Sequence, residues 1–317
     1  MTEIGGYIEL DTFNLPMRHD GALALNCGRN CLAYLIEARQ IRKIALPYFL
    51  CDSVRGVCDR CGVAVRRYHI GTDFLPVGLA LDADEWLYLV NYYGQLTAQQ
   101  MEEYAKKHPR IIIDNAQAYF DEPLSGVDTI YTCRKFFGVA DGAFLYTDAK
   151  LDRELPQDES FDRMRFVLGR FERTASEFYA EASANNRFFE TEPIKHMSKL
   201  TDNLLHAIDY AAAKRRRTEN YAYLADKLDG INRLKLRVVE GAFAYPLWLE
   251  NGAEVRKRLI AQKIYIPTLW SNVHSELPPD SLEYEMANNI LPLPVDQRYG
   301  AGEIKKVVCT ILPFYER

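Results

Sequence analysis

Two apolar runs that each end in polar side chains decide the fold of this chain. The first reads Arg110-Ile-Ile-Ile-Asp114, and the second reads Asp128-Thr-Ile-Tyr-Thr132-Cys-Arg-Lys135. Short apolar runs rich in β-branched residues are typical of strands that are buried on both faces of a parallel sheet. Because the carboxyl ends of parallel strands meet at one edge of a sheet, we expect the acid Asp114 and the amine Lys135 to lie close together.

An acid and a lysine at one sheet edge meet the requirements of a pyridoxal 5′-phosphate (PLP) site. The lysine forms a Schiff base with the aldehyde, and the carboxylate keeps the pyridine nitrogen protonated. Asp114 ends a run of three isoleucines, so its carboxylate needs a cation, although a helix cap is a simpler alternative. Gln117 lies one helical turn further on and faces the same ligand. Lysines are mostly surface residues, but Lys135 follows a buried strand and stands beside Arg134, so we expect a lowered amine pKa.

A glycine between the first strand and the first helix suggests a cradle for the cofactor phosphate. The junction reads Cys27-Gly28-Arg29-Asn30. Glycine lets a ligand approach the backbone closely, and the free N–H groups of Arg29 and Asn30 at the start of the helix favour an anion. A tight turn without a ligand is the simpler alternative. We expect the Thr132 hydroxyl to bind the same phosphate.

Composition excludes several classes of protein. A chain of 317 residues with 48% hydrophobic content and a net charge of -5 is not expected to bind nucleic acid or a membrane surface. No leader pattern or long apolar window is evident, so a cytoplasmic location is expected. The seven cysteines suit reduced thiols, and the pair Cys58 and Cys61 lacks further ligands, so no metal is expected.

Seven apolar runs alternate with helical patterns over the first half of the chain, which predicts an α/β fold with a largely parallel sheet covered on both faces. The expected strands cover residues 23–25, 43–46, 63–68, 86–90, 110–113, 128–131 and 143–146, and the expected helices cover 29–40, 52–61 and 97–107. Residues 158–229 are mainly helical in pattern. The end of the chain predicts strands at 236–239 and 244–249 around a helix at 253–262. We therefore expect a large PLP-binding domain with a helical extension at 1–213 and a small α+β domain at 214–317.

The chain resembles the DegT/DnrJ/EryC1/StrS family of fold-type I PLP-dependent sugar aminotransferases. The resemblance rests on several motifs in the family's order: Cys27-Gly-Arg-Asn30, Val90-Asn-Tyr-Tyr93-Gly-Gln95, Asp114-Asn-Ala-Gln117, Thr132-Cys-Arg-Lys135 and Leu291-Pro-Leu-Pro-Val-Asp-Gln-Arg298. It implies that Lys135 is the Schiff-base lysine and Asp114 the partner of the pyridinium. Gln117 would contact the ring, and Gly28, Arg29 and Thr132 would contact the phosphate.

The chain departs from the family pattern at two places. The family commonly has an asparagine and an arginine that reach into the partner's site, but Ile194 and His196 stand there in this chain. Lys195 or Asn186 would have to substitute, and His196 and Lys195 are the residues expected to contact the partner subunit or a substrate. The aromatic residue that usually stacks on the cofactor is also displaced, because Cys51 stands at its usual offset. Phe49 and Tyr93 are the candidates to replace it.

The resemblance implies an aminotransferase that moves an amino group from an amino acid donor, usually glutamate, to a nucleotide-linked keto sugar for polysaccharide biosynthesis. It also implies a homodimer. Cations for the acceptor's phosphates are expected from Arg298 or from one inward-turned member of the run Arg215-Arg-Arg217, most of which is expected to face solvent. The alternatives are a PLP-dependent lyase or dehydratase and a non-catalytic ligand-binding protein of the same fold.

Overall fold

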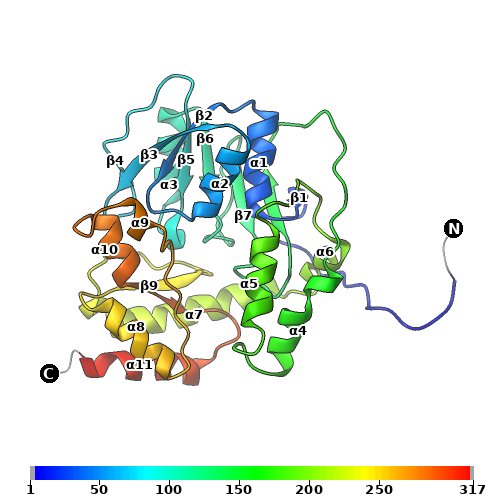
Figure 1. Ribbon diagram of the computed structural model, residues 1–317. Helices are drawn as coiled ribbons and strands as arrows, with labels where there is room; N and C mark the ends of the chain where they lie inside the picture. The colour runs from blue at the N-terminus through cyan, green and yellow to red at the C-terminus, as the bar shows by residue number, and fades with distance from the viewer. Residues whose placement is uncertain (1–3, 315–317) are drawn as a thin grey trace.

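A computed structural model describes residues 4–314 of the chain, and its centre is a sheet of eight strands (Figure 1). The order across the sheet is β1-β8-β7-β6-β5-β2-β3-β4. The strands are β1 (Leu23–Leu25), β2 (Lys43–Pro47), β3 (Ala64–Ile70), β4 (Pro76–Val77), β5 (Trp86–Val90), β6 (Ile111–Asp114), β7 (Asp128–Thr132) and β8 (Ala143–Tyr146). All seven expected strands are present, and β4 is a two-residue addition at the edge.

The middle of the sheet is parallel. Strands β3, β2, β5, β6 and β7 run in one direction, whereas β8 lies antiparallel between β7 and β1. In this register Asp114 pairs with Val90 on one side and Ile130 on the other. The carboxyl ends of β5, β6 and β7 therefore meet at one edge, and the predicted α/β fold class is confirmed.

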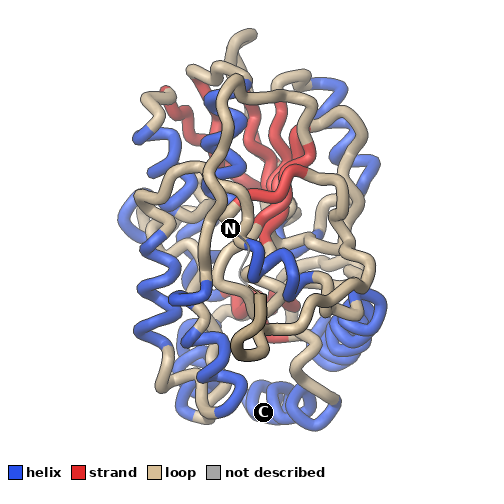
Figure 2. The backbone as a smooth tube through the Cα atoms, turned by 90° about the vertical axis from the view of Figure 1, so that its right-hand side faces the viewer, coloured by secondary structure: helices blue, strands red, loops and turns tan. Residues whose placement is uncertain are grey.

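Helices cover both faces of the sheet, as Figures 1 and 2 show. Apolar side chains recur on one side of these helices and pack against the buried strands, which forms the main core. The helices of this part are α1 (Gly28–Ala38), α2 (Asp52–Arg60) and α3 (Ala98–Lys107). Thr97 caps α3 by accepting the Gln100 N–H, as its position before the helix predicts.

A second core forms around a short antiparallel pair of strands towards the end of the chain. This part contains α7 (Tyr210–Leu228), β9 (Ala244–Trp248), α8 (Gly252–Ala261), α9 (Val273–Glu276), α10 (Leu282–Asn289), β10 (Ile290–Pro294) and α11 (Ala301–Ile311). The predicted boundary between residues 213 and 214 falls inside α7. On that helix Ala213 packs with the core around Phe136, whereas Tyr221 packs with the second core.

The prediction of a strand at 236–239 is wrong, because this segment forms no strand. The hydrogen bonds of Arg237 give the physical reason. Its backbone N–H donates to the Gln95 side chain, and its guanidinium donates to the carbonyls of Gly94, Gln95 and Leu96. The Gln95 side chain thus supplies the acceptor for the Arg237 backbone N–H that a neighbouring strand would otherwise supply.

The helical region after the sheet contains α4 (Arg165–Glu172), α5 (Tyr179–Phe188) and α6 (Lys199–Leu205). Asp141, in the loop before β8, fixes this region to the sheet. Its fully buried carboxylate accepts hydrogen bonds from the Ser198 N–H, the Ser198 hydroxyl and the Thr201 hydroxyl. Within residues 4–314, no helix is long and apolar enough to cross a membrane.

His19 carries a pH-dependent part of the stability. Its buried ring lies 3.0 Å from both the Tyr146 hydroxyl and the Tyr119 carbonyl, and the neutral ring satisfies both contacts. Burial lowers the pKa of His19 to about 4, well below its ordinary value. The unfolded chain therefore binds a proton at a pH where the folded chain does not.

We predict that this histidine stabilises the fold above pH ~6.5 and that the contribution is lost as the pH falls towards about 4. The free energy of unfolding should drop by up to about 3 kcal/mol over this window because of His19 alone. His19→Gln should flatten the curve when urea unfolding is measured at several pH values. His206→Gln, at a half-exposed position, should keep the parent slope. An unchanged slope in His19→Gln would contradict the assignment.

Candidate active site

Asp114 is the last residue of β6, and its carboxylate is buried without a cation. The Tyr88 hydroxyl donates to Oδ2 at 2.9 Å, and the Ala116 N–H donates to Oδ1 at 2.8 Å. Among the described residues, no lysine, arginine or histidine forms an ion pair with it. A buried carboxylate of this kind is prepared to receive a positively charged group from a ligand.

Lys135 follows β7. Part of its side chain is exposed to solvent, while the surrounding protein packs around its amine. Its Nζ lies 5.7 Å from the centre of the Phe243 ring. Burial by the surrounding protein lowers the pKa of the Lys135 amine, which Asp114 and Cys51 oppose and Arg134 reinforces. The lowered pKa agrees with the expectation from sequence, although burial contributes more than the neighbouring cation. A larger neutral fraction makes the amine a better nucleophile.

Gln117 and Tyr93 contact each other at the same edge of the sheet. The Gln117 Oε1 accepts the Tyr93 N–H at 2.8 Å. Tyr93 has a positive φ of 53° and a completely buried side chain whose hydroxyl has no partner among the described residues. Gln117 therefore fixes the backbone turn after β5, and its amide nitrogen is left to meet a ligand.

The start of α1 lies beside the end of β7. A Cβ at position 28 would lie 4.0 Å from the Thr132 Cβ, which is ordinary van der Waals contact. Phosphate binding by this junction stays a prediction. The Arg29 guanidinium donates to the backbone carbonyl and side-chain oxygen of Asn186, at 2.8 Å and 3.1 Å. Its charge is not neutralised by an acid in this contact.

Asn30 has a different role from the one expected. Its N–H donates to the Cys27 carbonyl, and its side-chain amide donates to Asn26, Glu192 and Pro193. All its donors are therefore used inside the protein, and Asn30 joins α1 to the turn at 192–193. The sequence does not reveal this, because the acceptors lie more than 160 residues away.

Of the two aromatic candidates, Phe49 packs in an aromatic cluster. Its buried ring lies 4.3 Å from the centre of Trp270 and 5.5 Å from that of Tyr92. Cys51, in the same turn, is exposed and raises the pKa of Lys135. A thiol therefore acts on Lys135 from the position where the family resemblance leads one to expect an aromatic ring.

Lys195 and His196 are not brought to Lys135. The Lys195 amine forms ion pairs with Glu192 at 2.6 Å and Asp158 at 3.6 Å. His196 pairs through its backbone with Leu25 of the edge strand β1 and lines a separate hollow with Tyr34. Contacts of these two residues with a partner subunit or a substrate stay predictions.

The basic run on α7 divides as the helical pattern predicts. Arg217 turns inward, where its guanidinium donates to Gln297, Ala242 and Phe136. Burial lowers the pKa of Arg217 to about 10. Arg298 is held by Asp296 through two hydrogen bonds. Neither guanidinium is therefore free to bind a phosphate of the acceptor substrate.

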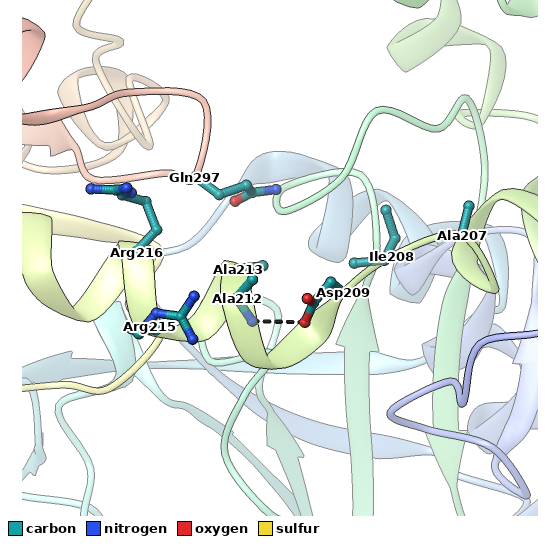
Figure 3. A pocket seen from close by; sticks show the side chains of 8 residues that line it. All are labelled: Ala207, Ile208, Asp209, Ala212, Ala213, Arg215, Arg216 and Gln297. Atoms are coloured by element: carbon teal, nitrogen blue, oxygen red, sulfur yellow. Dashed lines mark hydrogen bonds between the residues drawn. The ribbon is translucent and has the colours of Figure 1, made fainter.

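Arg215 and Arg216 line an open hollow of about 350 Å³ together with Asp209 and Gln297 (Figure 3). The hollow lies beside the Lys135 loop, because Gln297 donates its side-chain amide to the Phe136 carbonyl at 2.9 Å. Arg216 pairs with Glu219. The Arg215 guanidinium forms no ion pair or hydrogen bond with the rest of the described chain. Of the three arginines at 215–217, it is therefore the one that is unpaired and available to a ligand.

Sequence reasoning missed two residues around the site. Tyr88 binds Asp114 from the neighbouring strand, and Trp270 packs on Phe49 from the distant second half. Tyr88 lies two positions before the end of an adjacent strand, and this spacing is the one available signal for it. Nothing in the sequence marks Trp270.

The fold is shared with solved aminotransferases. The sugar aminotransferase CalS13 from Micromonospora echinospora superposes with a TM-score of 0.61 at 16% identity, over 97% of this chain and 100% of that one. A DegT DnrJ EryC1 StrS aminotransferase from Brucella abortus gives 0.60 at 15% identity, over 93% and 86%. NtdA from Bacillus subtilis, with bound cofactor PMP, gives 0.67 at 11% identity, over 93% and 73%.

The TM-scores show that the chain shares the fold of these solved aminotransferases, and at identities of 11–16% they show no more than the fold. No family model matches the sequence, and no curated protein matches it. What the chain does with this fold has to be argued from its own site.

Proposed function

We propose that the chain is a PLP-dependent aminotransferase. The observation that carries this proposal is the pairing of a buried, unneutralised carboxylate with a lysine of lowered pKa at one sheet edge, Asp114 and Lys135. The fold and the PMP-bound neighbour NtdA support it. The remaining residues are compatible with the cofactor, because Gly28 lies beside Thr132 and the Arg29 guanidinium meets only an uncharged oxygen of Asn186.

Bound PLP supplies an aldehyde that links to amines and a ring that takes up electrons from the substrate. Lys135 would hold the cofactor through that aldehyde, and its amine would act as the base that moves a proton to or from the donor. Asp114 would accept the hydrogen bond of the protonated ring nitrogen, with Tyr88 and Ala116 holding its two oxygens in place. Gln117, whose Oε1 accepts the Tyr93 N–H, would contact the ring.

Two other functions are less well supported. Relatives of the family that dehydrate sugars have histidine in place of the lysine, so Lys135 disfavours a lyase. A binding protein without catalysis would not need the depressed pKa of Lys135. The donor is expected to be glutamate, as is usual in the family. The expectations of a role in polysaccharide synthesis and of a cytoplasmic location stay predictions.

The absorbance of the PLP-loaded protein tests the reaction class. We expect a visible band that bleaches on addition of glutamate, since the amino group moves to the cofactor in the first half-reaction.

Lys135→Ala should lose this reaction while it stays folded. Asp114→Asn should keep PLP but lose most turnover, because an amide does not hold the ring nitrogen protonated. The exposed Lys106→Ala is the matched control. Bleaching that persists in Lys135→Ala, or near-parent turnover in Asp114→Asn, would remove that residue from its role.

We further propose that the acceptor is a keto sugar linked to a nucleotide. CalS13 is a sugar aminotransferase, and Arg215 offers an unpaired cation in a hollow beside the Lys135 loop. A guanidinium of this kind suits a phosphate or diphosphate. Arg298 was expected to supply the cation for these phosphates, but its guanidinium is neutralised by Asp296.

Titration with UDP-sugars and dTDP-sugars at several salt concentrations tests the acceptor. The affinity of the PLP-loaded protein should fall as salt rises, and Arg215→Gln should weaken it by about tenfold. Arg60→Gln, at an exposed arginine of α2, should match the parent. Absence of binding for both nucleotide classes would exclude a nucleotide-sugar and leave the aminotransferase proposal intact.

The homodimer implied by the family also stays a proposal, and exposed apolar side chains support it. Leu168 and Phe171 on α4 are 61% and 92% exposed, and Tyr7 in the N-terminal segment is 96% exposed. That segment extends away from the rest of the chain in Figure 1. Apolar surface of this kind on a folded chain is typical of a protein interface, and a second copy of the chain is the occupant we propose.

Sedimentation should give a particle of twice the chain mass at micromolar concentration. The double substitution Leu168→Asp and Phe171→Asp should shift the protein towards the monomer, because two charges cannot be buried in an apolar contact without a large penalty. Val77→Asp, at an exposed apolar position on β4, should leave the dimer unchanged. A parent protein that sediments as a stable monomer would contradict the proposal.

A further inference from the structure

The Arg134 guanidinium is a partly buried cation without an anion. Its Nε is buried and has no hydrogen-bond partner among the described residues, and the guanidinium forms no ion pair within residues 4–314. It stacks on Phe189, with Cζ 4.7 Å from the ring centre. Burial lowers the pKa of Arg134, so the charge is held at a cost. An unneutralised buried charge needs an explanation from outside the described chain.

Contacts of neighbouring residues place Arg134 near the start of α1. Thr132, two residues before Arg134, lies beside Gly28. Arg29 donates to Asn186, and Arg134 stacks on Phe189, three residues further along the same segment. The Asp141 carboxylate accepts hydrogen bonds from Ser198 and Thr201 and forms no ion pair with Arg134. The guanidinium therefore lies next to the proposed phosphate cradle.

A second cation lies in the same place. Arg29 is fixed by two hydrogen bonds to Asn186 of α5, and both acceptors are uncharged oxygens. Two guanidiniums that repel each other at the positive end of an eleven-residue helix create a strong preference for an anion. Thr132, at the end of β7 beside Gly28, adds a hydroxyl.

We propose that Arg134 is the principal phosphate-binding cation of this chain and that, with Arg29, Thr132 and the first turn of α1, it holds the phosphate of the cofactor from within one subunit. The inference rests on the proposed function. It accounts for Ile194 and His196 at the positions where the family resemblance leads one to expect residues that reach across to a partner. The segment that carries Asn186 and Phe189 covers the site in place of a partner chain.

The comparison of PLP with pyridoxal, which lacks the phosphate, isolates this contact. Both are titrated by absorbance into the parent, Arg134→Gln, Arg134→Lys and Arg163→Gln. Arg163 is the matched control because it stacks on the same Phe189 but is neutralised by Asp158. Arg134→Gln should bind PLP ~10- to 100-fold more weakly and pyridoxal within about twofold of the parent. Arg134→Lys should recover part of the loss, and Arg163→Gln should keep the parent ratio.

The outcomes separate the inference from the function on which it rests. Equal loss of PLP and pyridoxal in Arg134→Gln, or an unchanged ratio, would overturn the role of Arg134 while leaving the aminotransferase proposal in place. A parent protein that binds neither compound would overturn the proposed function. In that event inorganic phosphate is the probe: thermal stabilisation of the parent but not of Arg134→Gln would support the anion site, and stabilisation of neither would exclude it.

Discussion

The Asp114 carboxylate lies buried with two hydrogen bonds but no ion pair among the described residues, and this imbalance determines what the surrounding sheet edge has to provide. A strand of three isoleucines delivers the carboxylate to a place that water hardly reaches. The next strand delivers Lys135, whose pKa is lowered by burial and raised by that same carboxylate. Neither group neutralises the other by direct contact, so the pair is poised for a ligand that carries a positive nitrogen and an electrophilic carbon.

The proposed phosphate end of the site contains unpaired positive charges, whereas the Asp114 end contains an unpaired carboxylate. Arg29 and Arg134 carry two charges without an acid, at the start of α1. One end of the proposed site therefore favours an anion and the other favours a cation, which would orient a zwitterionic cofactor before any chemistry occurs. The helical region around α5 closes the phosphate end through Asn186 and Phe189.

The sequence predicted the parts of this arrangement that depend on local pattern. The strands and their polar ends follow from buried apolar runs, and the positions of Asp114, Gln117 and Lys135 follow from the strand ends. Side chains whose role depends on distant partners were not predictable. Asn30 was expected to meet the phosphate but binds the turn at 192–193, and Arg298 was expected to face the acceptor but is neutralised by a neighbouring acid. The segment at 236–239 has a strand-like pattern, yet Gln95 and Arg237 satisfy its backbone differently.

The most direct test of the central claim is the position of the covalent link between the protein and PLP. The protein is incubated with PLP, reduced with borohydride, digested and analysed by mass spectrometry. We predict one phosphopyridoxyl group per chain, on Lys135, because its amine has the lowered pKa and the cofactor is held by the phosphate and by Asp114. A label distributed over surface lysines such as Lys106 and Lys150, with Lys135 unmodified, would contradict the account.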